Sequence, residues 1–412
     1  MKIKFILLFF MVAMSAFAQK VADKIQSKKL NEERNFSVIL PDSYENSPEK
    51  KYPILVLLDG EYLADPFSGI LKYGNYWDDL PEIIIVAVNQ NYGETRFNDS
   101  NYGEDGLPAE SGAKFFEFIG FELLPYIQQK YRTLPFRIIA GHDTTAGFLN
   151  FYLYKDDPIF NAYISISPEM APEMEVRIAE RLAKTQKPVF YYQATSKADL
   201  EEIQENTKKL DDVAKEIKNT NLNYRYDVFQ NTSHYSLVAE AIPSAFYFIF
   251  NGYQPISKLE FNEKILKLES GYAQYLIDKY DNIEKKIGLK VQPRYSDFKA
   301  IEAAIIKNKA YSDFEILGAY ADKQFPKTML GTYHRGLYFE KIGDYKRAAK
   351  EYQSAYTKSE IGDLTKNYIL DRAEALKSRK EEPKQEIEES APVETPTETP
   401  TETPTETPKK DE

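Results

Sequence analysis

The sequence of 412 residues contains no cysteine. This absence excludes disulfides, thiolate catalysis, cysteine-containing zinc sites and lipid attachment through an amino-terminal cysteine. Histidine and tryptophan are scarce, with three residues and one residue respectively. A positive charge balance is also missing, because the net charge is −11 and the pI is about 5.2. This acidity argues against nucleic acid or an anionic membrane as the main partner.

The amino terminus has the composition of a signal peptide. Lys2 and Lys4 precede an apolar run from Phe5 to Met14, and Ala16–Ala18 supplies small residues for cleavage before Gln19. A retained membrane anchor is the alternative, but the run is too short to span a bilayer. Residues 1–18 therefore predict an exported protein, periplasmic or secreted, with no membrane span after cleavage.

The carboxyl terminus is repetitive. Residues 380–412 are acidic and contain Thr-Glu-Thr-Pro units. Prolines at short intervals forbid a helix, and almost no apolar residues remain to form a core. We expect a disordered, extended tail that keeps the protein soluble, with an O-glycosylated stalk as the alternative.

Strand and helix patterns alternate through residues 19–252. Short apolar or alternating runs predict strands, and longer stretches with apolar residues on one face predict helices. This rhythm indicates an α/β fold with a doubly wound, mainly parallel sheet, in which ligands bind at the carboxyl ends of the strands. The expected strands are 34–40, 53–58, 83–88, 136–140, 162–166, 189–194 and 223–229, and the expected helices are 111–130, 177–184, 200–218 and 237–250.

The stretch from Phe136 to Tyr154 joins a predicted strand to a predicted helix through a tight turn. Phe136–Ala140 is apolar, the chain breaks at Gly141, and apolar residues then recur with helical spacing. A strand, a tight turn and a helix form the nucleophile elbow, whose usual sequence is Gly-x-Ser-x-Gly. Here Asp143 stands at the serine position and Thr145 at the second glycine position. The frame of the elbow is kept, but its chemistry differs.

Residues 33–250 resemble the enterochelin-esterase-like family of α/β-hydrolases, also called the esterase D family. Each matching phrase is short, but together they occur in the family's order and spacing. The phrases are Tyr52–Glu61, Pro81–Val88, Arg137–His142, Ile164–Pro168 and Ser233–Ser236. The resemblance implies an α/β-hydrolase fold for about half of the chain.

Members of this family hydrolyse esters with a serine nucleophile, a histidine base and an acidic partner. By position, the resemblance implies Asp143 at the nucleophile site, His234 as the base and Asp199 as the acid. Asp199 also begins the predicted helix 200–218, so a helix cap or first-turn acid is an equally open and compatible role. The implied oxyanion donors are the backbone N–H groups of Thr144 and of the turn at Gly60 and Glu61.

An aspartate at the elbow permits opposite interpretations. It is a nucleophile in α/β-hydrolases that open epoxides or displace halide, but those reactions need a Trp or paired Tyr donors, and the only tryptophan is Trp77. In ester hydrolysis a carboxylate nucleophile would yield an anhydride, and its charge would repel the developing oxyanion. A branched Thr145 should also crowd a position that is normally glycine.

Asp143 should also affect the base. An ion pair with His234 would keep the imidazole protonated and unable to act as a base near neutral pH. A third hypothesis is that Asp143, His234 and Asp199 collect a metal ion, but no ligand spacing supports it. No metal and no cofactor are therefore predicted. His142, inside the elbow, is expected to pack beside the sheet.

Residues 253–379 carry helical patterns with few strand signals. Gly331–Tyr356 resembles a tetratricopeptide helix pair, with Gly343 and Asp344 at the turn. Only one repeat is clear, and about three are needed to bury a continuous core. A helical cap is therefore favoured over a peptide-binding groove.

The sequence predicts an exported esterase-family protein with a degenerate elbow and a small all-α region. The favoured hypothesis is an inactive or altered hydrolase that binds a small ester-like ligand, or a protein partner through its helical region. The alternative is an active hydrolase of carboxylic esters or related substrates that uses Asp143, His234 and an acid.

Overall fold

The computed structural model describes residues 20–377 and residue 379. The predicted signal peptide (1–18) and the predicted tail (380–412) lie outside the described residues. The described chain forms two compact units, one reaching to Tyr320 and the other beginning at Ala321. The predicted boundary at residue 252 coincides instead with the end of the last helix on the sheet. In the part of the chain that is described, no helix is long and apolar enough to cross a membrane.

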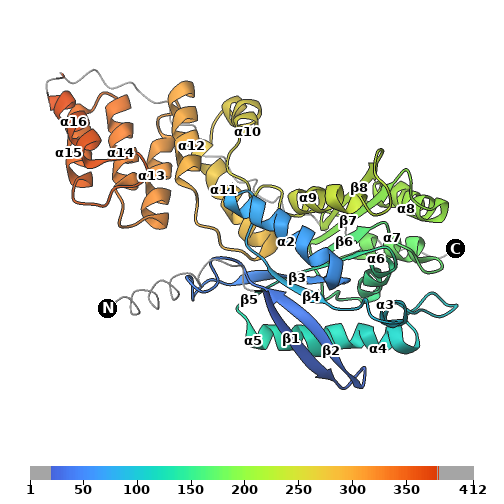
Figure 1. Cartoon of the computed structure of the whole chain (residues 1–412). Coiled ribbons are helices and arrows are strands. Elements are labelled where there is room, and N and C mark those ends of the chain that lie inside the picture. The colour runs from blue at the N-terminus through green and yellow to red at the C-terminus, as the bar shows by residue number, and fades with distance from the viewer. Residues whose placement is uncertain (1–19, 378, 380–412) are drawn as a thin grey trace, which may run out of the picture. The chain divides into compact units, whose positions relative to one another are not determined.

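The first unit is built on one sheet of eight strands (Figure 1). Their spatial order is β1-β2-β4-β3-β5-β6-β7-β8, and only the pairings β1–β2 and β2–β4 are antiparallel. The strands are β1 (Lys20–Ser27), β2 (Glu32–Ile39), β3 (Tyr52–Leu57), β4 (Ile84–Val88), β5 (Thr133–His142), β6 (Ala162–Ile166), β7 (Val189–Ser196) and β8 (Leu222–Phe229). The predicted α/β class and mainly parallel sheet are confirmed.

Helices cover both faces of this sheet, as Figure 1 shows. On one face α2 (Gly60–Tyr76) and α9 (Leu237–Ile249) pack together, with the rings of Phe67 and Phe246 5.6 Å apart. The other face carries α4 (Glu110–Phe118), α5 (Leu124–Lys130), α6 (Thr144–Phe148), α7 (Met174–Lys184) and α8 (Glu201–Ala214). Strands β3, β4 and β6 are buried along their whole length, as strands covered on both faces must be.

Several elements differ from the sequence predictions. Helix α2 and strand β1 were not predicted, and the predicted helix 111–130 contains a π-helical segment at Ile119–Leu123. The elbow helix is α-helical only over α6 and continues as a 3₁₀-helix, Leu149–Tyr154. A short helix, α3 (Thr95–Asp99), lies between β4 and α4.

Five helical segments lie between α9 and α14 (Leu330–Lys341). They are α10 (Lys258–Glu263), a 3₁₀ turn (Ile265–Lys267), α11 (Tyr272–Ile287), α12 (Tyr295–Asn308) and α13 (Asp313–Gln324). Arg294, just before α12, donates to the backbone oxygen of Asp78 (2.9 Å), at the end of α2, and to that of Tyr253 (2.8 Å). These bonds attach the start of α12 to the sheet domain, which explains why the compact unit extends past α9.

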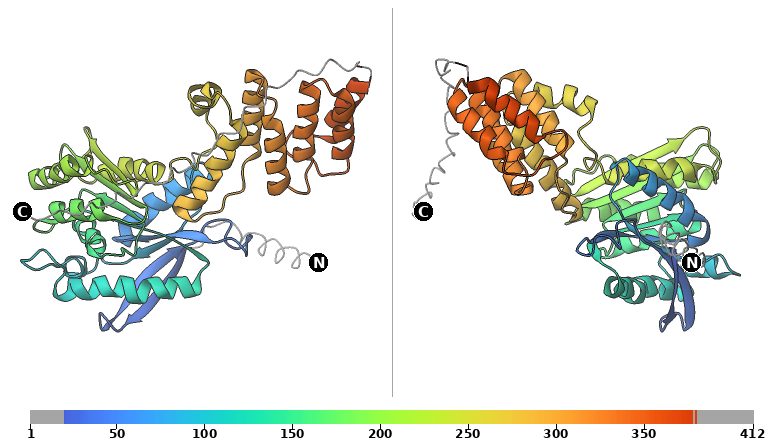
Figure 2. Two further views of the ribbon diagram at one scale, coloured as in Figure 1. Left: turned by 180° about the vertical axis from the view of Figure 1, so that it is seen from behind. Right: turned by 60° about the vertical axis from the view of Figure 1, so that its left-hand side comes forward.

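The second unit contains α14 (Leu330–Lys341), α15 (Tyr345–Ala355) and α16 (Lys366–Lys377), which lie side by side as the orange and red helices of Figure 2. Gly336 allows α14 and α15 to approach, because a Cβ there would lie 2.3 Å from the Tyr352 ring. Gly343 (φ 82°) makes the turn, and Asp344 caps α15 by accepting from the Arg347 N–H. The likeness to a tetratricopeptide repeat stays a prediction.

Candidate functional site

Three neighbouring strands end in a residue with a left-handed backbone. Asp59 follows β3 with φ 54°, Asp143 follows β5 with φ 60°, and Ser167 follows β6 with φ 51°. Residues other than glycine rarely adopt this backbone conformation, and such backbone strain is concentrated at functional sites. All three lie at the carboxyl edge of the sheet, where ligands bind in this class of fold.

The turn at Asp143 has the sharp geometry of a nucleophile elbow. Its backbone (φ 60°, ψ −124°) joins β5 directly to α6, and its N–H donates to the Ile166 carbonyl at 3.0 Å. Thr145 is fully buried but not crowded, because Gly141 leaves room for it: a Cβ at Gly141 would lie 2.8 Å from the Thr145 hydroxyl. The expected steric conflict at Thr145 is therefore absent.

His234 and Asp199 form a close acid–base pair. His234 Nδ1 lies 2.7 Å from Asp199 Oδ1, and the Asp199 side chain is fully buried. Asp199 Oδ2 also accepts from the Ser196 N–H and the Thr195 hydroxyl, each at 2.7 Å. Burial alone would raise the pKa of Asp199, but these hydrogen bonds outweigh it and lower the pKa. The imidazole is thus oriented by an ionised carboxylate.

The suggested helix-cap role of Asp199 is wrong. The residue before α8 is Leu200, and no side chain caps that helix. Asp199 instead bonds back to the end of β7, because it belongs to the turn that leaves the strand. Its bonds to Thr195, Ser196 and His234 direct the carboxylate toward the site.

Ser167 is a site residue that carried no predicted role. Its hydroxyl lies 3.1 Å from His234 Nδ1, on the same side of the ring as Asp199. The residue is fully buried and does not face Nε2, so it orients the imidazole and is not placed as a nucleophile. Its sequence signal was its place at the end of β6, inside the phrase Ile164–Pro168.

Asp143 faces the other nitrogen of the imidazole. Asp143 Oδ1 lies 3.9 Å from His234 Nε2, and Oδ2 lies 3.4 Å from Arg96 Nη1. The Asp143 side chain is 29% exposed and that of His234 is 21% exposed. The structure therefore brings Asp143, His234 and Asp199 together, although the expected Asp143–His234 ion pair is longer than a hydrogen bond.

Arg96, on α3, is a second site residue that carried no predicted role. Its Nε lies 2.7 Å from Asp59 Oδ1, and its Nη2 donates to Asp59 Oδ2 (3.1 Å) and to the His142 carbonyl (2.9 Å). Burial disfavours the charged guanidinium, but the bonds to Asp59 outweigh this and raise the pKa of Arg96. The Asp59–Arg96 ion pair stabilises the elbow, because Asp59 is fully buried and also accepts from Thr145 Oγ1 at 2.6 Å.

His142 packs beside the sheet, as expected, and also links site residues. Its Nε2 lies 3.1 Å from the His234 carbonyl, and its Nδ1 lies 3.3 Å from the Tyr62 hydroxyl. That hydroxyl donates to Asp59 Oδ2 at 2.9 Å. Burial, together with the nearby His234, lowers the pKa of His142. Because a carbonyl oxygen only accepts, Nε2 is the nitrogen that donates to the His234 carbonyl.

The predicted oxyanion donors lie at two helix starts beside the elbow. Thr144 is the first residue of α6, and Gly60 and Glu61 are the first two residues of α2. The first N–H groups of a helix have no partner within it. Gly60 lies against β4, since a Cβ there would be 2.7 Å from the Ala87 backbone. The Glu61 carboxylate turns away and accepts from the Asn91 N–H at 2.9 Å.

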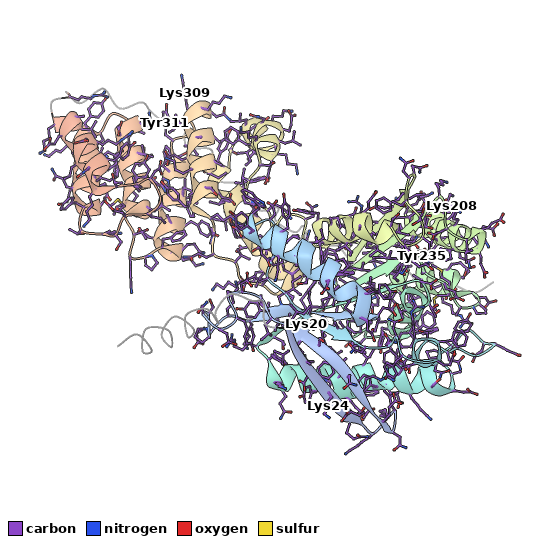
Figure 3. All side chains as sticks on the ribbon, in the orientation of Figure 1. Lys20, Lys24, Lys208, Tyr235, Lys309 and Tyr311 are labelled. Atoms are coloured by element: carbon purple, nitrogen blue, oxygen red, sulfur yellow. The ribbon has the colours of Figure 1, made fainter. Side chains whose placement is uncertain are left out.

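The surroundings of the site are acidic and aromatic. Glu169 accepts from the Thr144 hydroxyl at 2.8 Å. Tyr235, labelled in Figure 3, is 78% exposed, and its ring lies 5.0 Å from that of His234. Trp77 follows the far end of α2, roughly 25 Å along the helix axis from the site. Within residues 20–377, no group of three or more His, Asp or Glu side chains is arranged to hold a metal ion.

Comparisons with known proteins agree with this fold. A crystal structure of an uncharacterised protein from Capnocytophaga ochracea is 28% identical, with a TM-score of 0.80 over 88% of this chain and 100% of that one. An IroE-like serine hydrolase from Shewanella oneidensis is 20% identical, with a TM-score of 0.55 over 78% and 99% of the two chains. No protein of curated function matches the sequence.

The family comparison covers the sheet domain. The family described as "Putative esterase" matches residues 27–236, from the end of β1 to the loop that carries His234. This range is half of the chain and includes every residue of the elbow site. The likeness predicted from the sequence is confirmed, and the chain belongs to the putative esterase family.

Proposed function

We propose that this protein is a hydrolase-fold binding protein that does not hydrolyse esters by the serine mechanism of its family. The observation that carries the proposal is the carboxylate of Asp143, which occupies the elbow with Oδ1 3.9 Å from His234 Nε2. A serine hydroxyl would give its proton to Nε2 as it attacks. An ionised carboxylate has no proton to give, so His234 has no nucleophile to activate.

The environment of Asp143 also opposes acyl transfer. Oxyanion donors stabilise negative charge that develops beside the nucleophile. A carboxylate at the elbow places negative charge next to that position. The same groups suit ligand binding, since Asp143 and the backbone N–H of Thr144 offer an acceptor and a donor side by side. We propose a small ester-like molecule as the ligand; export and a protein partner for the helical region are further proposals that rest on the sequence.

Hydrolysis of p-nitrophenyl acetate and butyrate tests the proposal. The unchanged protein should hydrolyse both no faster than Asp143→Ala does. Asp143→Ser, alone and with Thr145→Gly, should raise the rate about 100-fold or more, because His234 and Asp199 are already paired. Adding His234→Ala to the serine variant should remove the gain. Wild-type activity that Asp143→Ala abolishes would overturn the proposal.

An active hydrolase with Asp143 as nucleophile is the second candidate. It is favoured by the intact His234–Asp199 pair, which could activate water to cleave an alkyl ester of Asp143. Against it, Trp77 is remote and the Tyr62 hydroxyl is already bonded to Asp59 and His142. Turnover of 1-chlorobutane or styrene oxide by the unchanged protein, lost in Asp143→Asn, would favour this candidate.

A further inference from the structure

The helices that follow the sheet in the first unit line an open cavity of about 450 Å³. The end of α9 and the helices α10 and α11 line it, and none of its residues belongs to the elbow site. Apolar side chains cover much of the wall, namely Ile249, Phe250, Ile283 and Ile287, with Tyr253 and Tyr275 beside them. The volume suits a small organic molecule.

Lys279, on α11, supplies a buried charge to this cavity. Its side chain is only 7% exposed, and its closest carboxylate oxygen is Glu260 Oε1, 3.7 Å from Nζ. That oxygen accepts a hydrogen bond from the Tyr275 hydroxyl at 2.8 Å. An ammonium offers three donors, so an acceptor that enters the cavity can bond to Lys279 beside Glu260.

The charge on Lys279 is costly to bury. Burial lowers the pKa of Lys279, although Glu260 and Asp297 oppose the effect. An acceptor that enters the cavity would lower the cost of burying the ammonium further. The ionisable lining residues also favour an anion, because three lysines face two carboxylates: Lys264, Lys279 and Lys286 against Glu260 and Asp278.

We propose that this cavity binds a small organic acid. The carboxylate of the acid pairs with Lys279 Nζ, and its aliphatic or aromatic body packs against Phe250 and Ile283. The site is separate from the elbow, so this proposal does not depend on whether Asp143 is catalytic. Lys264 and Lys286, which are exposed lining residues, attract the acid to the opening.

Titration of the full-length protein with benzoate and hexanoate, followed by calorimetry and ligand-observed NMR, tests the proposal. Benzamide is the neutral control for benzoate. We expect saturable binding of both acids, with benzamide at least tenfold weaker. Lys279→Met keeps the length of the side chain and should weaken benzoate binding at least tenfold. Lys208→Met, an exposed lysine on α8 labelled in Figure 3, should leave binding unchanged.

A second variant separates loss of the site from loss of the fold. Asn282→Trp narrows the cavity from its exposed side and keeps Lys279, so it should also abolish binding without lowering the melting temperature. Lys279→Met should lower it only slightly, because the Glu260 side chain left behind is 21% exposed and still accepts from the Tyr275 hydroxyl. The proposal fails if neither acid binds at millimolar concentration, if benzamide matches benzoate, or if Lys279→Met binds benzoate as the unchanged protein does.

Discussion

The acid–base half of the elbow site and the side chain of Asp143 differ in how tightly they are held. The acid–base half comprises Ser167, Asp199 and His234. Its contacts are 2.7–3.1 Å long, and the side chains of Ser167 and Asp199 are fully buried. Asp143 has contacts of 3.4 Å to Arg96 and 3.9 Å to His234, and is partly exposed. We therefore expect the stability of the fold to depend on the acid–base half and on the Asp59–Arg96 ion pair, but not on the side chain of Asp143.

Breaking the Asp59–Arg96 ion pair should have the largest effect on the free energy of unfolding. Arg96→Met leaves the fully buried Asp59 without its cation, and the free energy of unfolding should fall by about 3–5 kcal/mol. Urea denaturation followed by circular dichroism measures the change. The double variant Asp59→Asn with Arg96→Gln should recover part of the loss. A loss below about 1 kcal/mol would show that the pair does not support the elbow.

Removing the charge of Asp199 should have the next largest effect on the free energy of unfolding. Asp199→Asn removes the charge that accepts from Thr195, Ser196 and His234, and should cost about 1–3 kcal/mol. Glu205→Gln, an exposed change on α8, is the matched control and should cost less than about 0.5 kcal/mol. If both variants lose equally little, the Asp199 bonds do not stabilise the native state.

The Asp199 carboxylate should also make the stability of the folded protein sensitive to acid. The folded-state pKa of Asp199 lies below its ordinary value of 3.8, so its stabilisation is complete above that value and is lost as the pH falls through the folded pKa. Asp199→Asn should therefore lose less stability than the unchanged protein between pH 5 and pH 2. Parallel acid denaturation curves for the two proteins would contradict this expectation.

His142 should give a smaller effect at higher pH. Its pKa is lowered in the folded state from 6.5, so below about pH 7 the unfolded chain binds a proton that the folded chain does not. The free energy of unfolding should fall more steeply from pH 7 to pH 5 than in His142→Gln. The difference in slope is at most one proton, about 1.4 kcal/mol per pH unit. Equal slopes would show that another group controls this range.

Replacing Asp143 should have the smallest effect. Asp143→Asn keeps the shape of the side chain and removes a carboxylate whose contacts are all long, so stability should change by less than about 0.5 kcal/mol. Thermal unfolding at pH 7 measures it, with Asp199→Asn as the sensitive comparison. A loss as large as that of Asp199→Asn would remove the contrast between the two parts of the site.

The sequence was sufficient for seven of the eight strands, β2 to β8, and it indicated three residues that the structure brings together. Asp143 and His234 follow recognisable phrases at strand ends, and Asp199 follows the seventh strand. Strand β1 and helix α2 were missed, and for α2 the reason is physical. Helix α2 contains Pro66 and the glycines Gly69 and Gly74, which weaken a helical pattern, and packing against β4 and α9 overrides that weakness.

The missed site residues lacked any local pattern. Arg96 lies on a five-residue helix in a long connection, and its role arises only when β3 and β5 bring Asp59 and Asp143 to the same edge. Ser167 had a recognised phrase around it, but its orientation toward His234 depends on a left-handed backbone that no residue type signals. Long-range pairing of this kind cannot be read from spacing along one segment.

The left-handed backbone at residue 143 has a consequence for selection on this protein. Glycine adopts such a conformation without strain, so Asp143→Gly would relax the turn, and the long contacts of the carboxylate would offer little to offset that gain. A purely structural turn would thus be more stable without any side chain there. The acidic side chain on this strained turn is 29% exposed, so a molecule that enters from solvent can reach it.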